Sequence, residues 1–433
     1  MRNMRINDIS IIRTLLIFNI IAWYHLGYLF KLPGIINTLL LYNNLSFISA
    51  LVANMCFIYC ICKHNAMYIS VKNKLLFYYI GVCGIYFLLV VYTLLKYPSQ
   101  GVFSTIREGT NYLQILMVPA YVAVFCADGG VKRTMKHINY ISFVWYVLAI
   151  VQFVEYKIGG ILLFDFATYF NNSPVIRLYG LRIGVGCFGA LMILYNYICL
   201  YEASKSIRDK VFNIVQLVLG LFVVIYIQQT RMIIIVIFLC LIVCIFLCKK
   251  SPKIRRRELL AMIFLFLLLC VSGYFNNLLE EMLYIDTIEG NVSYSNRLYS
   301  INYYWECFKN NVLVGNAFVA DSLYYYSVVH GPMGVAHYSD VGIIGMLGQI
   351  GLCSLIFFGM PFFYLISVLR KLRHNFKTQY GYNILVMSLL YIGGTSITLL
   401  VTDYARTPMF AFIIAVAMYF DINLAAQGND TLT

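Results

Sequence analysis

The sequence predicts an all-α, polytopic membrane protein, and three observations lead to this fold class. Apolar residues make up 61% of the 433-residue chain, charged residues only 12%, and the mean hydropathy is +0.79. A soluble globular protein has about 25% charged residues, so this composition excludes an ordinary soluble enzyme, and the abundance of apolar residues excludes a disordered chain. The apolar residues also form long runs, and strongly basic segments alternate with weakly charged ones between those runs.

Twelve of the runs are long enough to cross a bilayer, whose hydrocarbon core of roughly 30 Å takes about 17–25 apolar helical residues. We expect membrane helices over residues 14–30, 43–62, 75–95, 111–127, 138–156, 181–200, 211–227, 232–248, 259–275, 340–369, 381–401 and 408–422. The first run lacks the small-residue cleavage site of a signal peptide, so we interpret it as a retained anchor. The run 340–369 is long enough for a tilted helix or for a helix with an extension on the membrane surface.

The distribution of lysine and arginine orients these helices, because basic loops stay on the cytoplasmic side of a membrane. With the N-terminus inside, the inward segments hold 22 of the 32 basic residues, and the alternation continues without a break across all twelve helices. An overlooked or invented helix would invert the pattern downstream of it. We therefore expect both termini in the cytoplasm, and we attribute the net charge of +14 to membrane orientation rather than to nucleic-acid binding.

One outer segment is far longer than the others. Residues 276–339 join the ninth and tenth helices, and we expect them to form a large extracytoplasmic loop within a single membrane domain that spans residues 1–433. Long loops usually carry function. The loop is rich in tyrosine, which can stack on sugar rings, although aromatic residues also gather at any membrane interface.

An amphipathic helix is predicted within this loop, after Asn296. Apolar residues recur there at helical spacing, and the resulting stripe marks a helix that lies either on the membrane surface or on the helical bundle. The residues of the stripe are Leu298, Ile301, Trp305, Phe308 and Val312.

Ten basic residues lie outside the cytoplasmic segments, and six of them are arginines. Arg177 and Arg182 lie at the beginning of the sixth helix, on either side of Tyr179 and Gly180, Arg231 lies in a four-residue turn between two apolar runs, and Arg297 lies in the large loop. A guanidinium group presents a planar pair of donors that match phosphate oxygens, and it stays charged at any relevant pH. These four arginines are candidates for binding an anionic, lipid-linked substrate. Contact with lipid head groups or an ion pair with a nearby carboxylate is the alternative.

A second group of polar residues closes the large loop, where the chain returns to the membrane. His337 and Asp340 lie there, and a histidine near a carboxylate is suited to general-base catalysis. Asp340 could equally cap the N-terminus of the tenth helix. His330 and His337 lack the further ligands of a metal site, and the chain contains no Asp-x-Asp pair, so we expect no metal.

Four short segments, in this order, carry a likeness to a known family. They are residues 176–180 (IRLYG) before a helix, 230–231 (TR) in a tight outer turn, 295–298 (SNRL) ahead of Trp305 and 314–315 (VG), and 337–345 (HYSDVGIIG). They resemble the bacterial superfamily of O-antigen polymerases and O-antigen ligases, which are membrane glycosyltransferases that act on polyprenyl-pyrophosphate-linked glycans. The sequence departs from the family pattern where it lacks a proline before Gly315 and where Tyr338 separates His337 from Ser339.

The resemblance implies an enzyme of the bacterial cytoplasmic membrane with its active site on the outer face. It implies that the four outer arginines bind the diphosphate in place of a metal, and that His337 or Asp340 accepts the proton of the attacking sugar hydroxyl. It also implies no cofactor. The implied partners are a polyprenyl-pyrophosphate-linked oligosaccharide, membrane lipids, a chain-length regulator and a flippase. The pattern S-D-x-G-I-I-G favours a repeat-unit polymerase, which makes O-antigen, capsule or exopolysaccharide, over a ligase.

A transporter of lipid-linked oligosaccharide is the alternative from another functional class. Transporters often show two similar halves and ionisable residues deep within their helices. The sequence shows no convincing repeat and few charges within the spans. We therefore expect polymerisation rather than transport.

Overall fold

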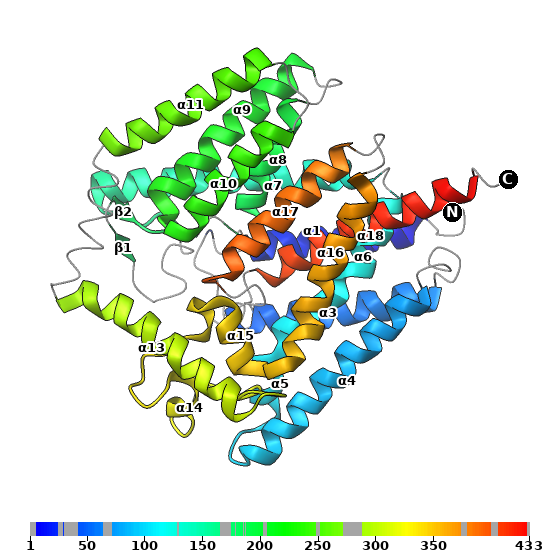
Figure 1. The fold of residues 1–433 in the computed structure, drawn as a ribbon, viewed down its shortest axis with the longest axis vertical. Helices are drawn as coiled ribbons and strands as arrows, with labels where there is room; N and C mark the ends of the chain where they lie inside the picture. Colours follow the sequence, from blue (N-terminus) through cyan, green and yellow to red (C-terminus); the bar gives the residue numbers. More distant parts are fainter. Residues whose placement is uncertain are drawn as a thin grey trace.

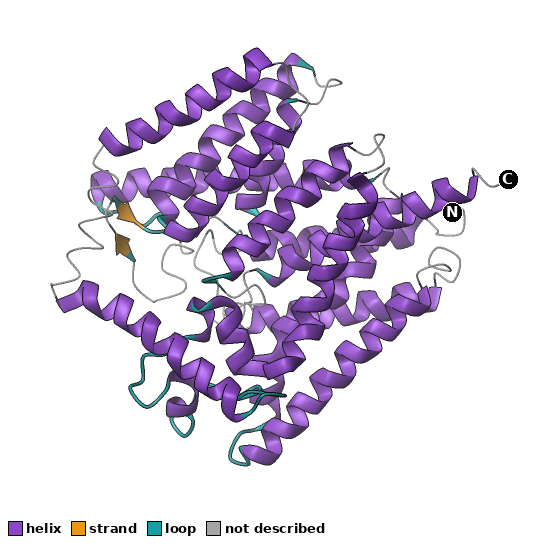
Figure 2. Ribbon diagram, viewed as in Figure 1, coloured by secondary structure: helices purple, strands orange, loops and turns teal. Residues whose placement is uncertain are grey.

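The computed structural model describes residues 6–24, 29, 42–63, 72–127, 130–164, 175–177, 179–184, 186, 188–201, 206–247, 252–271, 288–373, 379–399 and 406–430. Within these ranges the protein is helical, apart from loops and one ladder of two short strands (Figures 1 and 2).

A helix lies over at least part of each of the twelve predicted runs. The elements are α1 (Ile6–Trp23), α3 (Tyr42–Lys63), α4 (Lys72–Lys96), α5 (Val102–Leu113), η2 (Gln114–Met117), α6 (Val118–Ala127), α7 (Val131–Gly159), β1 (Ile176–Arg177), β2 (Gly180–Leu181), α8 (Gly189–Leu200), α9 (Ile207–Phe222), η4 (Val223–Gln228), α10 (Arg231–Leu247), α11 (Pro252–Val271), α13 (Ile288–Asn310), α14 (Tyr326–His330), η6 (Tyr338–Asp340), α15 (Gly342–Ile350), η7 (Gly351–Cys353), η8 (Leu355–Gly359), α16 (Met360–Arg373), α17 (Gln379–Ser396) and α18 (Thr407–Asp430).

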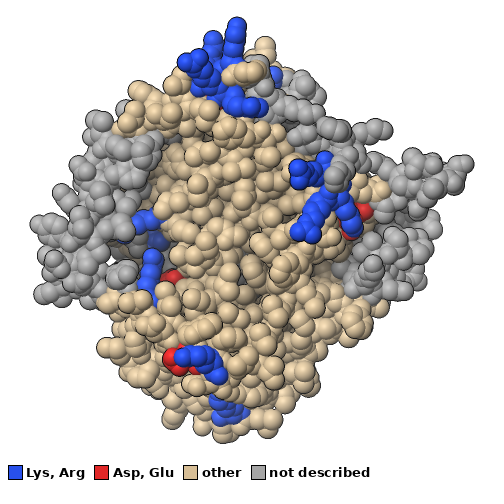
Figure 3. All heavy atoms as spheres, in the orientation of Figure 1, with Lys and Arg blue, Asp and Glu red and all other residues tan. Residues whose placement is uncertain are grey.

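Within the described ranges, six helical segments are long and apolar enough to cross a bilayer, which indicates a multi-pass membrane protein. They are Leu76–Lys96, Val102–Ala127, Val131–Gly159, Ile207–Gln228, Leu355–Arg373 and Thr407–Leu424. The surface agrees with this reading, because the lysine and arginine side chains seen in Figure 3 gather towards the edges of the face shown, and its centre is uncharged. An uncharged surface of this kind suits a hydrocarbon environment, in which an unpaired charge is costly.

The predicted run 340–369 forms two helices instead of one tilted helix. α15 ends at Ile350, and the next residue, Gly351, has φ of 56°, a left-handed conformation that favours glycine. A Cβ atom at this position would meet the backbone of Val312 and Leu313. The backbone N–H of Leu352 then donates to the carbonyl of Val312 at 2.8 Å, so the chain leaves the helical pattern to bond with a distant segment.

The predicted run 181–200 is helical only from Gly189, because its first residues belong to a small hairpin. β1 and β2 pair antiparallel, with Arg177 opposite Gly180. Gly180 and Gly186 have φ of 130° and 77°, and these conformations turn the chain before the helix begins. The hairpin therefore occupies a place that hydropathy alone assigns to a membrane helix.

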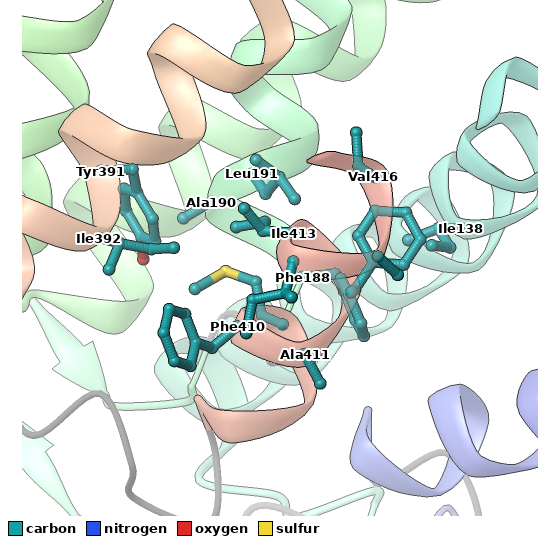
Figure 4. Packing of buried hydrophobic residues seen from close by; sticks show 14 of the residues in the cluster. Ile138, Phe188, Ala190, Leu191, Tyr391, Ile392, Phe410, Ala411, Ile413 and Val416 are labelled. Atoms are coloured by element: carbon teal, nitrogen blue, oxygen red, sulfur yellow. The ribbon is translucent and has the colours of Figure 1, made fainter. Parts of the chain in front are cut away.

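The core of the bundle is formed where α7, α8, α17 and α18 meet (Figure 4). Ile138, Phe188, Ile392, Phe410 and Ile413 are buried there. Because lipid is about as apolar as these side chains, close packing between helices, and not exclusion from water, holds such a core together. On α4, in contrast, one side is exposed and carries large apolar residues such as Phe77, Phe87 and Leu95, as expected for a helix that faces lipid on that side.

α13 lies apart from the main helix direction. Figure 1 shows α4, α16 and α17 running in similar directions, whereas α13 crosses them at the end of the bundle opposite both chain termini. The helix predicted after Asn296 is confirmed, and it begins earlier, at Ile288.

Candidate functional site

Two of the predicted arginines are brought together at the junction of the hairpin with the turn after η4. The Nε of Arg182 donates to the carbonyl of Gln228 at 3.1 Å, and its Nη2 donates to the hydroxyl of Thr230 at 3.3 Å. Arg231 begins α10 directly after this turn. Both arginines are half-buried. The structure thus places Arg182, 49 residues earlier in the chain, at the turn that carries Arg231.

Arg177 lies on the same hairpin, in β1. Its backbone pairs with that of Gly180, and its side chain lies outside the described residues.

The chain reaches Arg231 through an uncommon backbone conformation. η4 is a π-helix, and Gln229 has φ of 54°, which residues other than glycine adopt rarely. The side-chain oxygen of Gln228 is buried and finds no donor within the described part of the chain. π-helical segments, left-handed non-glycine residues and unsatisfied polar groups are each enriched at functional sites. The turn before Arg231 combines all three.

Aromatic rings lie beside this turn. The ring of Tyr179, in the hairpin, is 5.3 Å from the ring of Tyr226 in η4, and Phe222 is 5.1 Å from Tyr226. Aromatic faces next to cationic groups suit a ligand that combines sugar rings with phosphate.

His337 and Asp340 lie in the segment that leads into α15. The backbone N–H of His337 donates to the Ser300 hydroxyl of α13 at 3.2 Å, and that of Asp340 donates to the carbonyl of His337 at 3.3 Å. Both side chains are exposed. The N-cap of α15 is Val341, and no side chain caps this helix, so the interpretation of Asp340 as a helix cap is wrong. Its carboxylate remains available for chemistry.

A histidine–carboxylate pair that the sequence did not predict lies next to His337. The Nε2 of His330 is 2.9 Å from Oδ2 of Asp321, and its Nδ1 is 2.9 Å from the carbonyl oxygen of Ala336. The rings of His330 and His337 meet edge to face, with 4.9 Å between their centroids. Both nitrogens of the buried His330 are therefore engaged, whereas the side chain of His337 is exposed. Asp321 and His330 are nine residues apart across a loop, and no spacing rule pairs them.

Two tyrosines of α13 fix the loop that carries His330. The hydroxyl of Tyr303 donates to the carbonyl of Val328 at 2.7 Å, and that of Tyr304 donates to the carbonyl of Val329 at 2.5 Å. Burial raises the pKa of both hydroxyls above the usual value of a tyrosine, so both remain protonated donors at physiological pH.

The carboxyl end of α17 lies between two parts of the candidate site. One is the turn between η4 and α10 that leads to Arg231, called the arginine turn below, and the other is the segment 337–340. α10 packs on Gly394 through Val236, in the second turn after the arginine turn, and α15 packs on the backbone of Ser396 through Gly342. The two groups of candidate residues therefore adjoin the same helix end and belong to one region of the molecule. Ligand sites of helical proteins often lie between helices, which makes this end of α17 a candidate site.

The remaining charged residues of this region differ in their placement. Arg297 lies on α13, and its side chain is exposed. Arg406 precedes α18 and lies within electrostatic range of Tyr391 on α17, which places a further arginine near the end of that helix. Glu108 of α5 lies within electrostatic range of Asp321 and contributes another carboxylate. The sequence alone gave no reason to associate Glu108 or Asp321 with the site.

Among the described residues, no group of three or more histidine, cysteine, aspartate or glutamate side chains is arranged to hold a metal ion. Searches with protein-family models and against curated protein sequences found no match to this chain. Its residues and their geometry are therefore the basis for inferring what it does.

Proposed function

We propose that the protein is a membrane glycosyltransferase that polymerises polyprenyl-pyrophosphate-linked oligosaccharide repeat units into a surface polysaccharide, on the outer face of the bacterial cytoplasmic membrane. The observation that carries this proposal is the junction of Arg182 with the turn of Arg231 at the end of an apolar bundle. A lipid-linked diphosphate requires such a place, because its isoprenoid chain stays in hydrocarbon while its diphosphate needs cationic donors close to the membrane surface.

In the proposed topology all twelve helical runs cross the membrane, both termini are cytoplasmic, and residues 276–339 form an extracytoplasmic loop. The positions of the termini support this arrangement, because both lie at one end of the bundle and α13 lies at the other (Figure 1). An impermeant maleimide applied to intact cells should label the exposed position in Asn302→Cys but not that in Arg373→Cys. Burial raises the pKa of the native Cys307 thiol, so its background labelling should be low.

In the proposed reaction, the hydroxyl oxygen of an acceptor sugar bonds to the anomeric carbon of the donor as the bond from that carbon to the diphosphate oxygen breaks. His337 or Asp340 accepts the hydroxyl proton, and the polyprenyl diphosphate leaves with the electron pair. Arg182 and Arg231, assisted by Arg177 and Arg297, offset the charge that develops on the diphosphate. Preorganised donors of this kind contribute about 2.7–4 kcal/mol each to transition-state stabilisation.

A deletion of the gene in its own host tests the proposal. Electrophoresis of the surface glycans should then show single repeat units in place of long chains. Lipid-linked polymer that is not transferred to its final acceptor would indicate a ligase instead. Loss of repeat units from the outer face of the membrane would indicate a transporter.

A further inference from the structure

α13 packs on the bundle with a side that is not its most apolar side. Ser300 and Tyr304 are buried, and Tyr304 packs on Gly348 of α15. Leu298 and Trp305, from the predicted apolar stripe, are 48% and 44% exposed. Of the stripe, Ile301 packs against the buried cluster around Tyr304, whereas Leu298, Trp305 and Val312 remain exposed.

Three strips follow one another around α13, since successive residues of a helix are rotated by about 100°. The strip that packs on the bundle consists of Ser300, Tyr304 and Cys307. The next strip is exposed and apolar, and it consists of Leu298, Trp305 and Val312 just beyond the helix end. The third strip is exposed and polar, and it consists of Asn302, Glu306 and Lys309. This order is expected if the first strip faces protein, the second faces hydrocarbon and the third faces water.

The apolar strip also continues onto the side of a candidate membrane span. The carbonyls of Val312 and Leu313 accept hydrogen bonds from the backbone N–H groups of Leu352 and Cys353, at 2.8 and 3.2 Å. The span Leu355–Arg373 begins two residues later, and its apolar residues Leu355 and Phe363 are exposed in turn. The stripe of α13 thus lies at the level where this span enters the membrane.

We propose that α13 is an interfacial helix whose Leu298, Trp305 and Val312 insert into the outer leaflet of the lipid bilayer. Its direction fits this role, because α13 crosses the main helices at the end of the bundle opposite the termini (Figure 1). Helices of this kind bury their apolar face roughly 5–10 Å into the boundary between head groups and acyl chains. A tryptophan in the strip suits that depth. The inference does not depend on the glycosyltransferase activity.

Tryptophan fluorescence provides the test, because Trp23 and Trp145 are each 1% exposed inside the bundle, whereas Trp305 is on the surface. The full-length protein and its Trp305→Phe variant would be reconstituted in phosphatidylcholine vesicles whose acyl chains carry bromine either near the head group or near the terminal methyl. Subtracting the emission of the variant from that of the full-length protein gives the emission of Trp305. Bromine near the head group should quench this emission by about half, and bromine near the methyl end by less.

Aqueous iodide supplies the opposing measurement. Strong quenching of Trp305 by iodide would place the strip in water and overturn the proposal. Quenching by neither bromine nor iodide would mean that protein covers the strip, for example a second copy, and would overturn it as well. A matched control combines Trp305→Phe with Asn302→Trp, which moves the indole to the polar strip, where iodide and not bromolipid should quench it.

Discussion

The two sides of the proposed site are built in different ways. The arginine side consists of the hairpin before α8 and the turn between η4 and α10, and Arg182 is held there by hydrogen bonds to Gln228 and Thr230. The side with His337 and Asp340 belongs to a long loop on a surface helix, and both side chains are exposed. The difference suggests a division of labour in which the first side binds a charged group in a fixed place and the second side admits an acceptor.

The hydrogen bonds support this division by what they hold: on the arginine side they position the charged group itself, and on the loop side they position the backbone. The guanidinium of Arg182, held by a backbone carbonyl and a hydroxyl, is positioned before any ligand arrives, and preorganised donors are the ones that stabilise developing charge efficiently. The loop side is held mainly by side chains that reach backbone carbonyls, such as Tyr303, Tyr304 and His330. Such contacts fix a loop while leaving room for local opening, in line with the general mobility of long loops.

The largest effect is expected at the arginine side. Arg231→Ala should lower polymer synthesis by about 10³-fold, because a preorganised charge-stabilising donor contributes about 10²–10³-fold and the apparent loss also includes weaker donor binding. Arg231→Lys should recover only part of the activity, since a lysine keeps the charge but loses the planar pair of donors. The measurement is chain length and yield on a glycan gel, with the amount of protein in the membrane checked by immunoblot.

Arg373→Ala is the matched control for this prediction. Arg373 is an exposed arginine at the carboxyl end of α16, away from the candidate site. Wild-type chain lengths are expected for it. Wild-type chain lengths in Arg231→Ala would contradict the assignment of the arginine side to the diphosphate.

A smaller effect is expected from the loop side. Substitution of the general base should lower the rate by about 10²-fold, near the lower limit for general acid–base catalysis. His337→Gln and Asp340→Asn distinguish the two candidates, because only the loss of the true base should remove the dependence of turnover on pH. The measurement is a pH profile of polymerisation with purified lipid-linked repeat units. Unchanged profiles and rates in both variants would show that neither residue is the base.

A still smaller effect is expected from the pair behind His337. Asp321→Asn and His330→Gln each disturb the hydrogen bonds around the His330 ring, which contacts His337, and we expect a decrease in turnover of about tenfold with substrate binding unchanged. The double variant should be little worse than either single one, because the two residues act as a unit. Additive losses in this cycle would mean that Asp321 and His330 act independently.

The two sides of the proposed site also differ in how much of their structure the sequence predicts. The hydropathy runs located the helices, and the unusual arginines were recognisable because, in the predicted topology, they stand against the charge rule for membrane loops. The sequence also shows that the segment with Arg177 and Arg182 comes before the turn with Arg231. It did not reveal that Arg182 bonds to the turn of Arg231, since that contact depends on how the hairpin folds back.

On the loop side the sequence gave much less. Asp321 and His330 belong to a segment without periodicity, and their pairing depends on tertiary contacts such as those of Tyr303 and Tyr304. The helix predicted over 340–369 is interrupted at Gly351, where the absence of a side chain lets a distant backbone segment pack closely. Hydropathy carries no signal for such a contact. The periodicity of α13 was readable, but the environment of its apolar strip required the structure.

The smallest effect is expected at Tyr304, whose substitution tests how firmly the loop side is held. Tyr304→Phe removes a donor from the carbonyl of Val329, and a buried carbonyl left without its partner costs about 1–3 kcal/mol in local stability. Hydrogen exchange or proteolysis of the loop around residues 321–336 should therefore become faster, while the arginine side remains protected. Because burial raises the pKa of Tyr304, this hydroxyl stabilises the folded loop fully below the unfolded pKa of about 10, and the contribution is lost as the pH rises through the folded value. Protection of the loop should accordingly be constant between pH 6 and 9, and a marked change within that range would assign the control of the loop to another group.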